Sequence, residues 1–491
     1  MSLNNALMIA SQSLGTISSQ INLVSKNISG AGTEGVAKKT ALLTTGLNGA
    51  SELKGVRRET NIPVLEQMLS ANSRLAGSKR ISDALDQIDL SLNLSDPAES
   101  RTPASLISKL SDSLLNYSVK PDSRSLAELS IQAARDLLTV IREGSNLIKD
   151  IRKQSDNNIS TGVSNINDIL DKISSVNKDI ITTNSRDADI TDLMDRRDAL
   201  LSQLSEIIGI RTVLRPNQDI VIYADNGATL FETSPRPVSF LPSADLSAGR
   251  IGSPVYIDGI QATGNSASSP LVSGALAGDI KIRDQLAPMY QIQLDEIARG
   301  LIVSFAEKDQ SGSGKPPLPG LFTTAGTSDI PGPNLISGLS DQIIINPSVD
   351  PMQGGDVQLL RDGGMSGDPA YIYNKDLAVG YSERLQELSE SISLGQSYDS
   401  RSGLDVQASL LDFSQGSIGW ISSQRQNVTK ETIYQNAIVT QSRITLSNTT
   451  GVNIDEQMSQ MLTLENAFQA SAKVLQTINS VYDALFSAID R

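Results

Sequence analysis

The chain has 491 residues and a net charge of -14, which indicates several domains and opposes binding to nucleic-acid phosphates. It contains no cysteine and no histidine, so zinc fingers, Ser-His-Asp triads, cysteine nucleophiles and haem ligation are excluded. No apolar run reaches the roughly 18 residues of a membrane span, and we expect no membrane contact. The first basic residue is Lys26, so the start is not a signal peptide.

A heptad pattern occupies the N-terminal residues. Apolar residues recur with alternating spacings of four and three, at Leu3, Leu7, Ala10, Leu14, Ile17, Ile21, Val24 and Ile28. This pattern predicts a long helix over residues 1–28 with Ser2 as its N-cap. Residues 1–25 hold no charged side chain, so the other faces of this helix carry Ser, Asn, Gln and Thr.

The middle of the chain begins with a helical pattern over residues 123–208. A capping box from Ser125 to Glu128 predicts its start, and breaks are predicted near Gly144 and at residues 184–187. Long helices packed side by side are therefore expected in this region.

Residues 211–282 change to short β-branched runs with turns. Asp225-Asn226-Gly227 predicts one hairpin and Asp258-Gly259 predicts another. Helix is expected again over 282–308, with Pro288 at a helix start or kink. Residues 311–370 are expected to form loops around one strand at 342–346. A helical pattern returns over 374–447.

A second heptad pattern ends the sequence. Its positions are Met461, Leu464, Phe468, Ser471, Leu475, Ile478, Tyr482, Leu485 and Ile489, and only Ser471 interrupts the apolar series. Asn453 followed by Glu456 forms a capping-box pattern that predicts the start of this helix.

The two terminal helices are interpreted as one pair, parallel or antiparallel, that packs between neighbouring subunits of an assembly. Ordinary surface helices are the alternative, but a solvent-facing coiled coil normally carries charges beside its apolar seam. The candidate assembly interface comprises Leu3, Leu7, Leu14, Ile17, Ile21, Val24, Ile28, Met461, Leu464, Phe468, Leu475, Ile478, Tyr482, Leu485 and Ile489.

Three patterns suggest chemistry, and a structural explanation is favoured for each. Residues 30–35 match G-x-G-x-x-G but follow a helix rather than a strand, and residues 51–54 and 175–178 match S-x-x-K without its partner motifs. The acidic cluster at 187–198 lacks EF-hand spacing. We expect Asp187 or Asp189 to cap a helix and Asp192 to pair with Arg196. No catalytic residue, cofactor or metal is therefore expected.

The ends of the chain resemble those of the rod, hook and hook-associated proteins of the bacterial flagellum. The similarity is strongest over residues 450–489, through GVNIDEQM, the run LENAFQASAKV and the ending YDALFSAI. The segment DLMDRRDALLSQLSEIIGI at 192–210 resembles the hook-associated protein 1 family in particular. Residues 30–36 depart from the axial-protein pattern, because Gly35 and Val36 replace a Gly-Tyr pair.

The resemblance implies a multidomain α+β fold with nested layers. We expect a terminal coiled-coil domain over 1–60 and 448–491, a helical domain of long packed helices over 61–210 and 371–447, and an inserted mainly-β outer domain over 211–370. A helix near 283–308 is expected to pack with the helical domain.

The resemblance also implies a function, namely a non-enzymatic structural adaptor that joins the flagellar hook to the filament. Such a protein would self-associate in a ring or tube and contact the hook protein and the second junction protein. It would be exported through the flagellar type III apparatus to the extracellular flagellum, with an export chaperone holding the C-terminal helix. The alternatives are another axial protein, whether hook, rod or flagellin-like, or a secreted effector enzyme.

Overall fold

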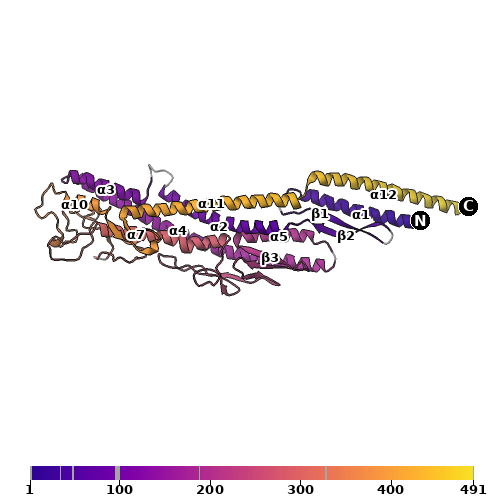
Figure 1. Ribbon diagram of the computed structural model, residues 1–491, viewed down its shortest axis with the longest axis horizontal. Helices are drawn as coiled ribbons and strands as arrows, with labels where there is room; N and C mark the ends of the chain where they lie inside the picture. Colours follow the sequence, from indigo (N-terminus) through magenta and orange to yellow (C-terminus); the bar gives the residue numbers. More distant parts are fainter. Residues whose placement is uncertain are drawn as a thin grey trace.

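The computed structural model describes residues 3–33, 35–46, 49–93, 100–186, 188–326 and 329–489. It is an elongated molecule in which a body of long helices continues into a thinner terminal part (Figure 1). The terminal part comprises α1 (Leu3–Gly30), the strands β1 (Lys39–Thr45) and β2 (Ser51–Arg58), and α12 (Ile454–Ile489). The long helices of the body are α2 (Ile62–Leu92), α3 (Pro103–Val119), α4 (Arg124–Asn184), α5 (Thr191–Ile207), α7 (Ala287–Ser304) and α11 (Leu410–Thr450).

The remaining elements of the body are short. They are β3 (Ile210–Leu214), β4 (Ile220–Ala224), β5 (Thr229–Phe231), β6 (Val238–Phe240), β7 (Val255–Ile257), β8 (Ile260–Gln261), α6 (Ala275–Lys281), β9 (Phe322–Thr324), α8 (Leu339–Gln342), β10 (Ile343–Ile345), α9 (Leu359–Asp362), α10 (Glu383–Ser391), β11 (Gly395–Ser397) and β12 (Gln407–Ser409). A π-helical turn, η1 (Ile282–Leu286), joins α6 to α7, and 3-10 turns occur at η2 (Pro351–Gln353), η3 (Pro369–Tyr371) and η4 (Ser400–Ser402).

Two hydrophobic cores divide the body along α4. The first 28 residues of this 61-residue helix contribute Ile131, Leu138 and Ile148 to a core shared with α3, α7, α10 and the start of α11. Its second half contributes Ile159 and Ile173 to a core shared with α5 and the strands β3 to β7. One helix therefore ties the helical half of the body to its sheet-bearing half.

The start of α4 differs from the prediction, and so does its continuity. The N-cap is Ser123, whose Oγ accepts a hydrogen bond from the Leu126 amide at 3.4 Å, so the predicted Ser125 capping box is wrong. The helix also passes through Gly144 without a break, because this glycine serves close packing. A Cβ there would lie 3.1 Å from Leu294 Cδ1 of α7. The predicted break near residue 184 is confirmed, while Asp187 lies outside the described residues.

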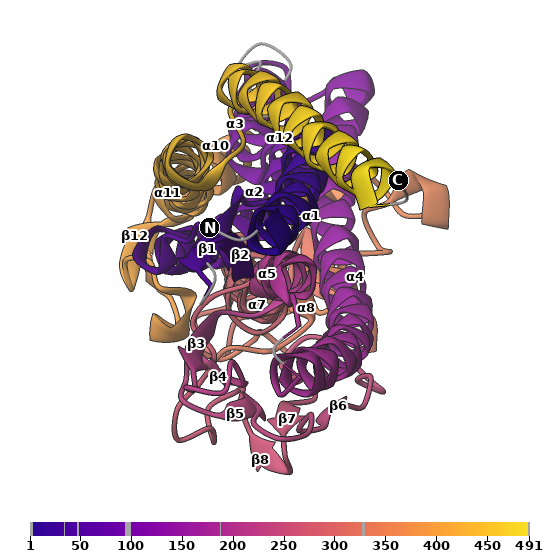
Figure 2. The ribbon, with the colours of Figure 1, turned by 90° about the vertical axis from the view of Figure 1, so that its right-hand side faces the viewer.

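The strands β3 to β8 form two small sheets that lie along one side of the body (Figure 2). Strands β3, β4 and β5 form one antiparallel sheet, and β6, β7 and β8 form another. Both predicted hairpin turns are confirmed, at residues 225–228 between β4 and β5 and at 258–259 between β7 and β8. Asp258 and Gly259 both have positive φ, as a two-residue turn of this hand requires.

The segment after the sheets returns to the helical half of the body. Pro288 is the second residue of α7, directly after the π-helical turn, so its predicted place at a helix start is confirmed. The predicted strand at 342–346 is β10, paired with β9. The predicted helix over 374–447 is interrupted, because the β11–β12 hairpin separates α10 from α11.

The predicted fold class, multidomain α+β with long terminal helices, is confirmed. The exact limits of the three domains remain a prediction. The antiparallel β1–β2 hairpin beside α1 was not predicted. None of the helices within the described ranges is long and apolar enough to cross a membrane.

Candidate assembly interface

The two terminal helices form an antiparallel pair. Figure 1 places both ends of the chain at the same end of the molecule, with α1 and α12 side by side. The direction follows from one contact, because Asn27 near the end of α1 hydrogen-bonds Gln457 near the start of α12 at 2.8 Å. Of the two orientations left open by the sequence, the structure therefore adopts the antiparallel one.

Helix α1 lies between α12 and the β1–β2 hairpin. On the hairpin side, Thr16 donates a hydrogen bond to the Ser51 carbonyl at 2.7 Å, and Gln12 donates one to Glu52. On the predicted seam, Val24 is buried. The other predicted seam residues, Leu3, Leu7, Leu14, Ile17, Ile21 and Ile28, are half-buried. The N-cap predicted for Ser2 lies outside the described residues.

The predicted seam of α12 is only partly covered by α1. Leu464 and Ile478 are buried, and Met461, Leu475 and Tyr482 are half-buried. Phe468 and Leu485 are exposed, at 40% and 50%. Ile489 is the last residue of the helix, and its side chain lies outside the described part of the structure. The seam therefore faces α1 along its centre and is open along its edges.

Further apolar side chains of α12 flank the seam and are exposed. Val474 and Val481, seven residues apart, are 51% and 41% exposed, and Leu485 continues the same face four residues on. Met458 and Leu462, four residues apart, are exposed as well. Residues at these spacings share a helix face, so α12 presents apolar strips beyond the one that α1 covers.

A polar junction holds the base of the terminal pair. The amide of Asn27 bridges two elements, because its Nδ2 donates to the Lys39 carbonyl of β1 and to Gln457 Oε1, both at 2.8 Å, and its Oδ1 accepts from the Lys39 amide. The predicted cap of α12 is confirmed, since Asn453 Oδ1 accepts from the Glu456 amide at 3.2 Å. These contacts fix where α12 begins relative to α1 and the hairpin.

The acidic cluster of α5 has a different role from the predicted one. Asp189 does accept a hydrogen bond from the amide of Thr191, the first residue of α5. Asp192, however, pairs with Lys26 and Lys39 rather than with Arg196, so that part of the prediction is wrong. Burial opposes the charged form of Lys39, but hydrogen bonds and attraction from the Asp192 and Asp195 carboxylates outweigh it and raise the pKa of Lys39.

The other chemical motifs lie in ordinary structural positions. The G-x-G-x-x-G segment follows the end of α1 and leads into a strand, with positive φ at Gly32 and Gly35 and with Glu34 outside the described residues. Ser175 and Lys178 are exposed one turn apart on α4, and Ser51 begins β2. No cluster of three or more potential metal-ligating side chains occurs among the described residues.

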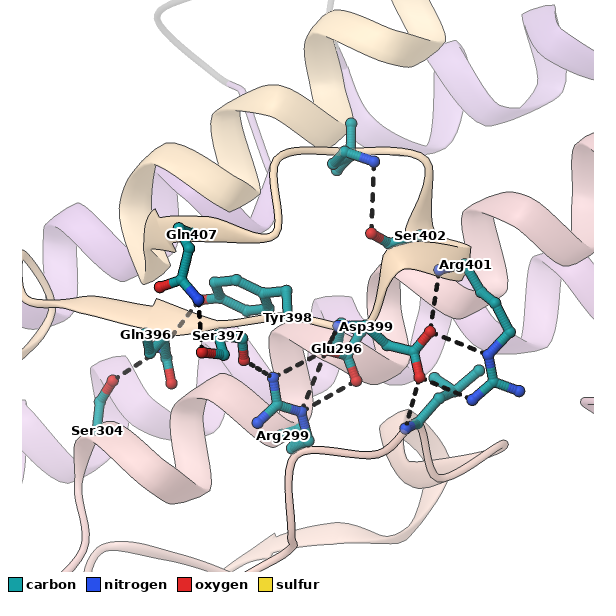
Figure 3. Close-up of polar contacts among 12 residues, drawn as sticks. Glu296, Arg299, Ser304, Gln396, Ser397, Tyr398, Asp399, Arg401, Ser402 and Gln407 are labelled. Atoms are coloured by element: carbon teal, nitrogen blue, oxygen red, sulfur yellow. Dashed lines mark hydrogen bonds and ion pairs between the residues drawn. The ribbon is translucent and has the colours of Figure 1, made fainter.

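A polar cluster of the body fastens a loop to α7 (Figure 3). The buried carboxylate of Glu296 accepts from the Arg299 guanidinium at 2.8 Å and from the Asp399 amide at 2.8 Å. Arg299 also donates to the Ser397 carbonyl and lies over the Tyr398 ring. Hydrogen bonds from the Arg401 side chain and amide hold the pKa of Asp399 well below its usual range. These groups contact one another, so the cluster joins the 395–407 segment to the first core.

A sequence pattern could have predicted the β1–β2 hairpin, although the heptad pattern of the terminal helices drew attention away from it. Asn48-Gly49 is a turn dipeptide between two runs of strand-forming residues. The base of the hairpin contacts carboxylates of α5 through Lys39 and Arg58. These partners are more than 130 residues apart in sequence, as the contact of Arg58 with Asp198 illustrates. Local patterns carry no information on pairs at that separation.

Comparison with known proteins found similar proteins of the bacterial flagellum. A family model described as the flagellar hook-associated protein FlgK helical domain matches residues 86–317, and one described as the flagellar basal body rod FlgEFG protein C-terminal matches 447–488. Flagellar hook-associated protein 1 of Escherichia coli strain K12 is 23% identical over 99% of both chains. Flagellar hook-associated protein 1 of Salmonella typhimurium is 25% identical over 62% of this chain and 56% of its own length.

A solved structure shares the fold. The structure of the flagellar hook junction protein FlgK from Burkholderia pseudomallei superposes with a TM-score of 0.56 at 12% identity, covering 78% of this chain and 99% of that chain. The full-length similarity, the two family models and the shared fold agree with the layered helical architecture described above. The chain is thus similar over its full length to flagellar hook-associated protein 1, and its residues 86–317 match the FlgK helical domain.

Proposed function

We propose that this chain is a structural adaptor that joins the flagellar hook to the filament and polymerises through its terminal helices. One observation carries the polymerisation step: α12 exposes Met458, Leu462, Val474 and Val481 beside a seam that α1 covers only in part, and Leu485 of that seam is exposed as well. Exposed apolar strips of this kind on a helix are typical of surfaces that another protein covers. A second copy of the chain is the proposed cover.

The chemistry of the outer faces supports packing inside an assembly. The face of α12 opposite α1 carries mostly uncharged residues such as Ser459, Asn466 and Thr477, together with the charged Lys473. Uncharged polar faces lose less solvation free energy on burial than charged faces do, so they suit helices that neighbours surround. If each subunit contacts the next through different surfaces, repeating the contact around one axis builds a ring or tube.

We further propose the hook protein and the second junction protein as neighbours, and an export chaperone at α12 before assembly. The chaperone proposal has a physical reason, because the exposed apolar side chains of α12 are an aggregation hazard in the free subunit. The proposed location is the extracellular flagellum at the hook–filament junction. The role is structural, as it is for the family.

The test places a charge on the exposed edge of α12. Val474→Asp and Val481→Asp should block filament growth and release flagellin into the medium, because a carboxylate would be buried between subunits without a partner. Val474→Thr and Val481→Thr are the matched controls, since threonine has nearly the shape of valine and adds no charge. Electron microscopy of cells and immunoblots of the culture medium provide the readout.

Two outcomes would contradict the proposal. Normal filaments on the Val474→Asp and Val481→Asp strains would show that this surface is not an interface between subunits. Loss of filaments in the Val474→Thr and Val481→Thr strains as well would show that the buried charge is not the cause of the defect.

A further inference from the structure

The terminal part meets the body through a compact set of ion pairs between the base of the hairpin and α5. Lys39 of β1 pairs with Asp192 and, at 3.1 Å, with Asp195. Arg58 of β2 pairs with Asp195 at 2.7 Å and with Asp198 at 2.5 Å. Lys26 of α1 adds a longer, exposed pair with Asp192 at 3.5 Å. Three cations of the terminal part therefore face three carboxylates that lie on one face of α5.

Most of this set is withdrawn from solvent. The side chains of Lys39, Asp195 and Arg58 are 6%, 10% and 10% exposed, and that of Asp198 is 15% exposed. Inside a protein such charges are stable only while they remain paired, because solvent no longer compensates a lost partner. A rotation of the terminal part that separated the hairpin from α5 would break these ion pairs.

Lys39 links the set to both terminal helices. Its side chain contacts the carboxylates of α5, while its backbone amide and carbonyl both hydrogen-bond the side chain of Asn27 in α1. Asn27 in turn bonds Gln457 of α12. Helix α5 is therefore connected to α1 through two consecutive polar contacts and to α12 through a third.

We propose that Lys26, Lys39, Arg58, Asp192, Asp195 and Asp198 form an ionic clasp that sets the angle between the terminal helix pair and the body. The clasp residues are positioning residues, since they act on the assembly surface through the hairpin and α1. Buried ion pairs contribute little net stability compared with apolar packing, but they can select one arrangement over others. A subunit of a ring needs such a selected angle, and in that respect the inference rests on the proposed function.

The angle is measurable in the free subunit. Because the chain contains no cysteine, Asn436→Cys on α11 and Asn466→Cys on α12 give two unique spin-label sites, both exposed. Double electron–electron resonance on the full chain then reports the distance between body and terminal pair. The clasp-neutralised variant is Asp195→Asn with Asp198→Asn, and Asp195→Glu with Asp198→Glu keeps the charge. Arg57→Ala is a further control, because Arg57 is exposed on the same hairpin and pairs with Glu59, two residues away.

We expect one narrow distance distribution in the unmodified chain, in the glutamate variant and in Arg57→Ala, and loss of the narrow distribution in the neutralised variant. An unchanged distribution in the neutralised variant would overturn the proposal. So would a loss of its overall helical circular dichroism, because the carboxylates would then be needed for the fold and not for the angle.

The clasp and the assembly role fail separately. A distance that depends on the clasp, together with normal filaments in the Val474→Asp strain, would reject the proposed interface and keep the clasp. A distance that does not depend on the clasp, together with filament loss in that strain, would reject the clasp and keep the interface.

Discussion

Leu464 and Leu462 lie two residues apart on α12 and differ in what covers them. Leu464 is 8% exposed in the contact with α1, whereas Leu462 is 58% exposed. Truncating a buried leucine to alanine costs about 2 to 5 kcal/mol, and the low end applies where neighbours can relax into the space, as in a two-helix seam. We expect Leu464→Ala to destabilise the terminal pair by about 2 kcal/mol. Leu462→Ala should change the stability of the terminal pair by about 0.5 kcal/mol or less, as substitutions at other exposed positions do.

Hydrogen exchange of the free subunit measures this difference directly. A loss of about 2 kcal/mol raises the population of the open terminal pair roughly 30-fold, since each 1.4 kcal/mol is a factor of ten. Amides of α1 and α12 should therefore exchange roughly 30-fold faster in Leu464→Ala and almost unchanged in Leu462→Ala. Amides of α4, in the body, should exchange at the same rate in both variants.

The two leucines should behave in the opposite way in assembly. Leu462→Ala leaves the free subunit intact but removes part of an exposed apolar strip, so it should weaken incorporation into flagella more than it weakens the fold. Equal acceleration of exchange in both variants would refute the packing described here, and so would no acceleration in Leu464→Ala.

Two further predictions concern the body. Gly278→Ala should lower the free energy of unfolding by about 2 kcal/mol in urea denaturation, because the added Cβ would lie 2.6 Å from the Gly77 carbonyl of α2. Gly162→Ala should be neutral or slightly stabilising, because its Cβ would lie 3.5 Å from Ile207. Equal costs in the two variants would contradict the close crossing of α2 and α6. Burial raises the pKa of Asp279 to about 6, so the folded chain holds this proton more tightly than the unfolded chain and stability should fall as pH rises from about 4 to 6. Asp279→Asn should remove this dependence and gain up to about 3 kcal/mol at pH 7, and an unchanged pH profile in the variant would contradict it.

Sequence periodicity correctly predicted the features that are determined by residues close together in the chain. The heptad residues Val24, Leu464 and Ile478 are buried between α1 and α12, and Asn453 caps α12, because spacing along a helix and a nearby side chain decide both features. The hairpin turns at residues 225–228 and 258–259 were also predictable, since Asn, Asp and Gly tolerate the backbone angles that such turns require.

The misplaced features depend on contacts between distant segments. Gly144 read as a helix break, yet α4 continues because α7 approaches closely at that glycine. Asp192 read as a partner for Arg196 one turn away, yet Lys39 and Lys26 reach it from the terminal part. In each case a contact between distant segments overrides the local preference. The nearby sequence gives no indication of the distant partner.

The most direct test compares the free subunit with subunits held at hook–filament junctions, by hydrogen exchange over residues 454–489. In the free subunit the edges of α12 are exposed, and its amides should exchange through frequent opening of the terminal pair. At the junction a neighbouring copy would cover Val474, Val481 and Leu485, and exchange of these amides should slow strongly while that of α4 stays the same. Equal exchange of α12 in the two states would contradict assembly through the terminal helices.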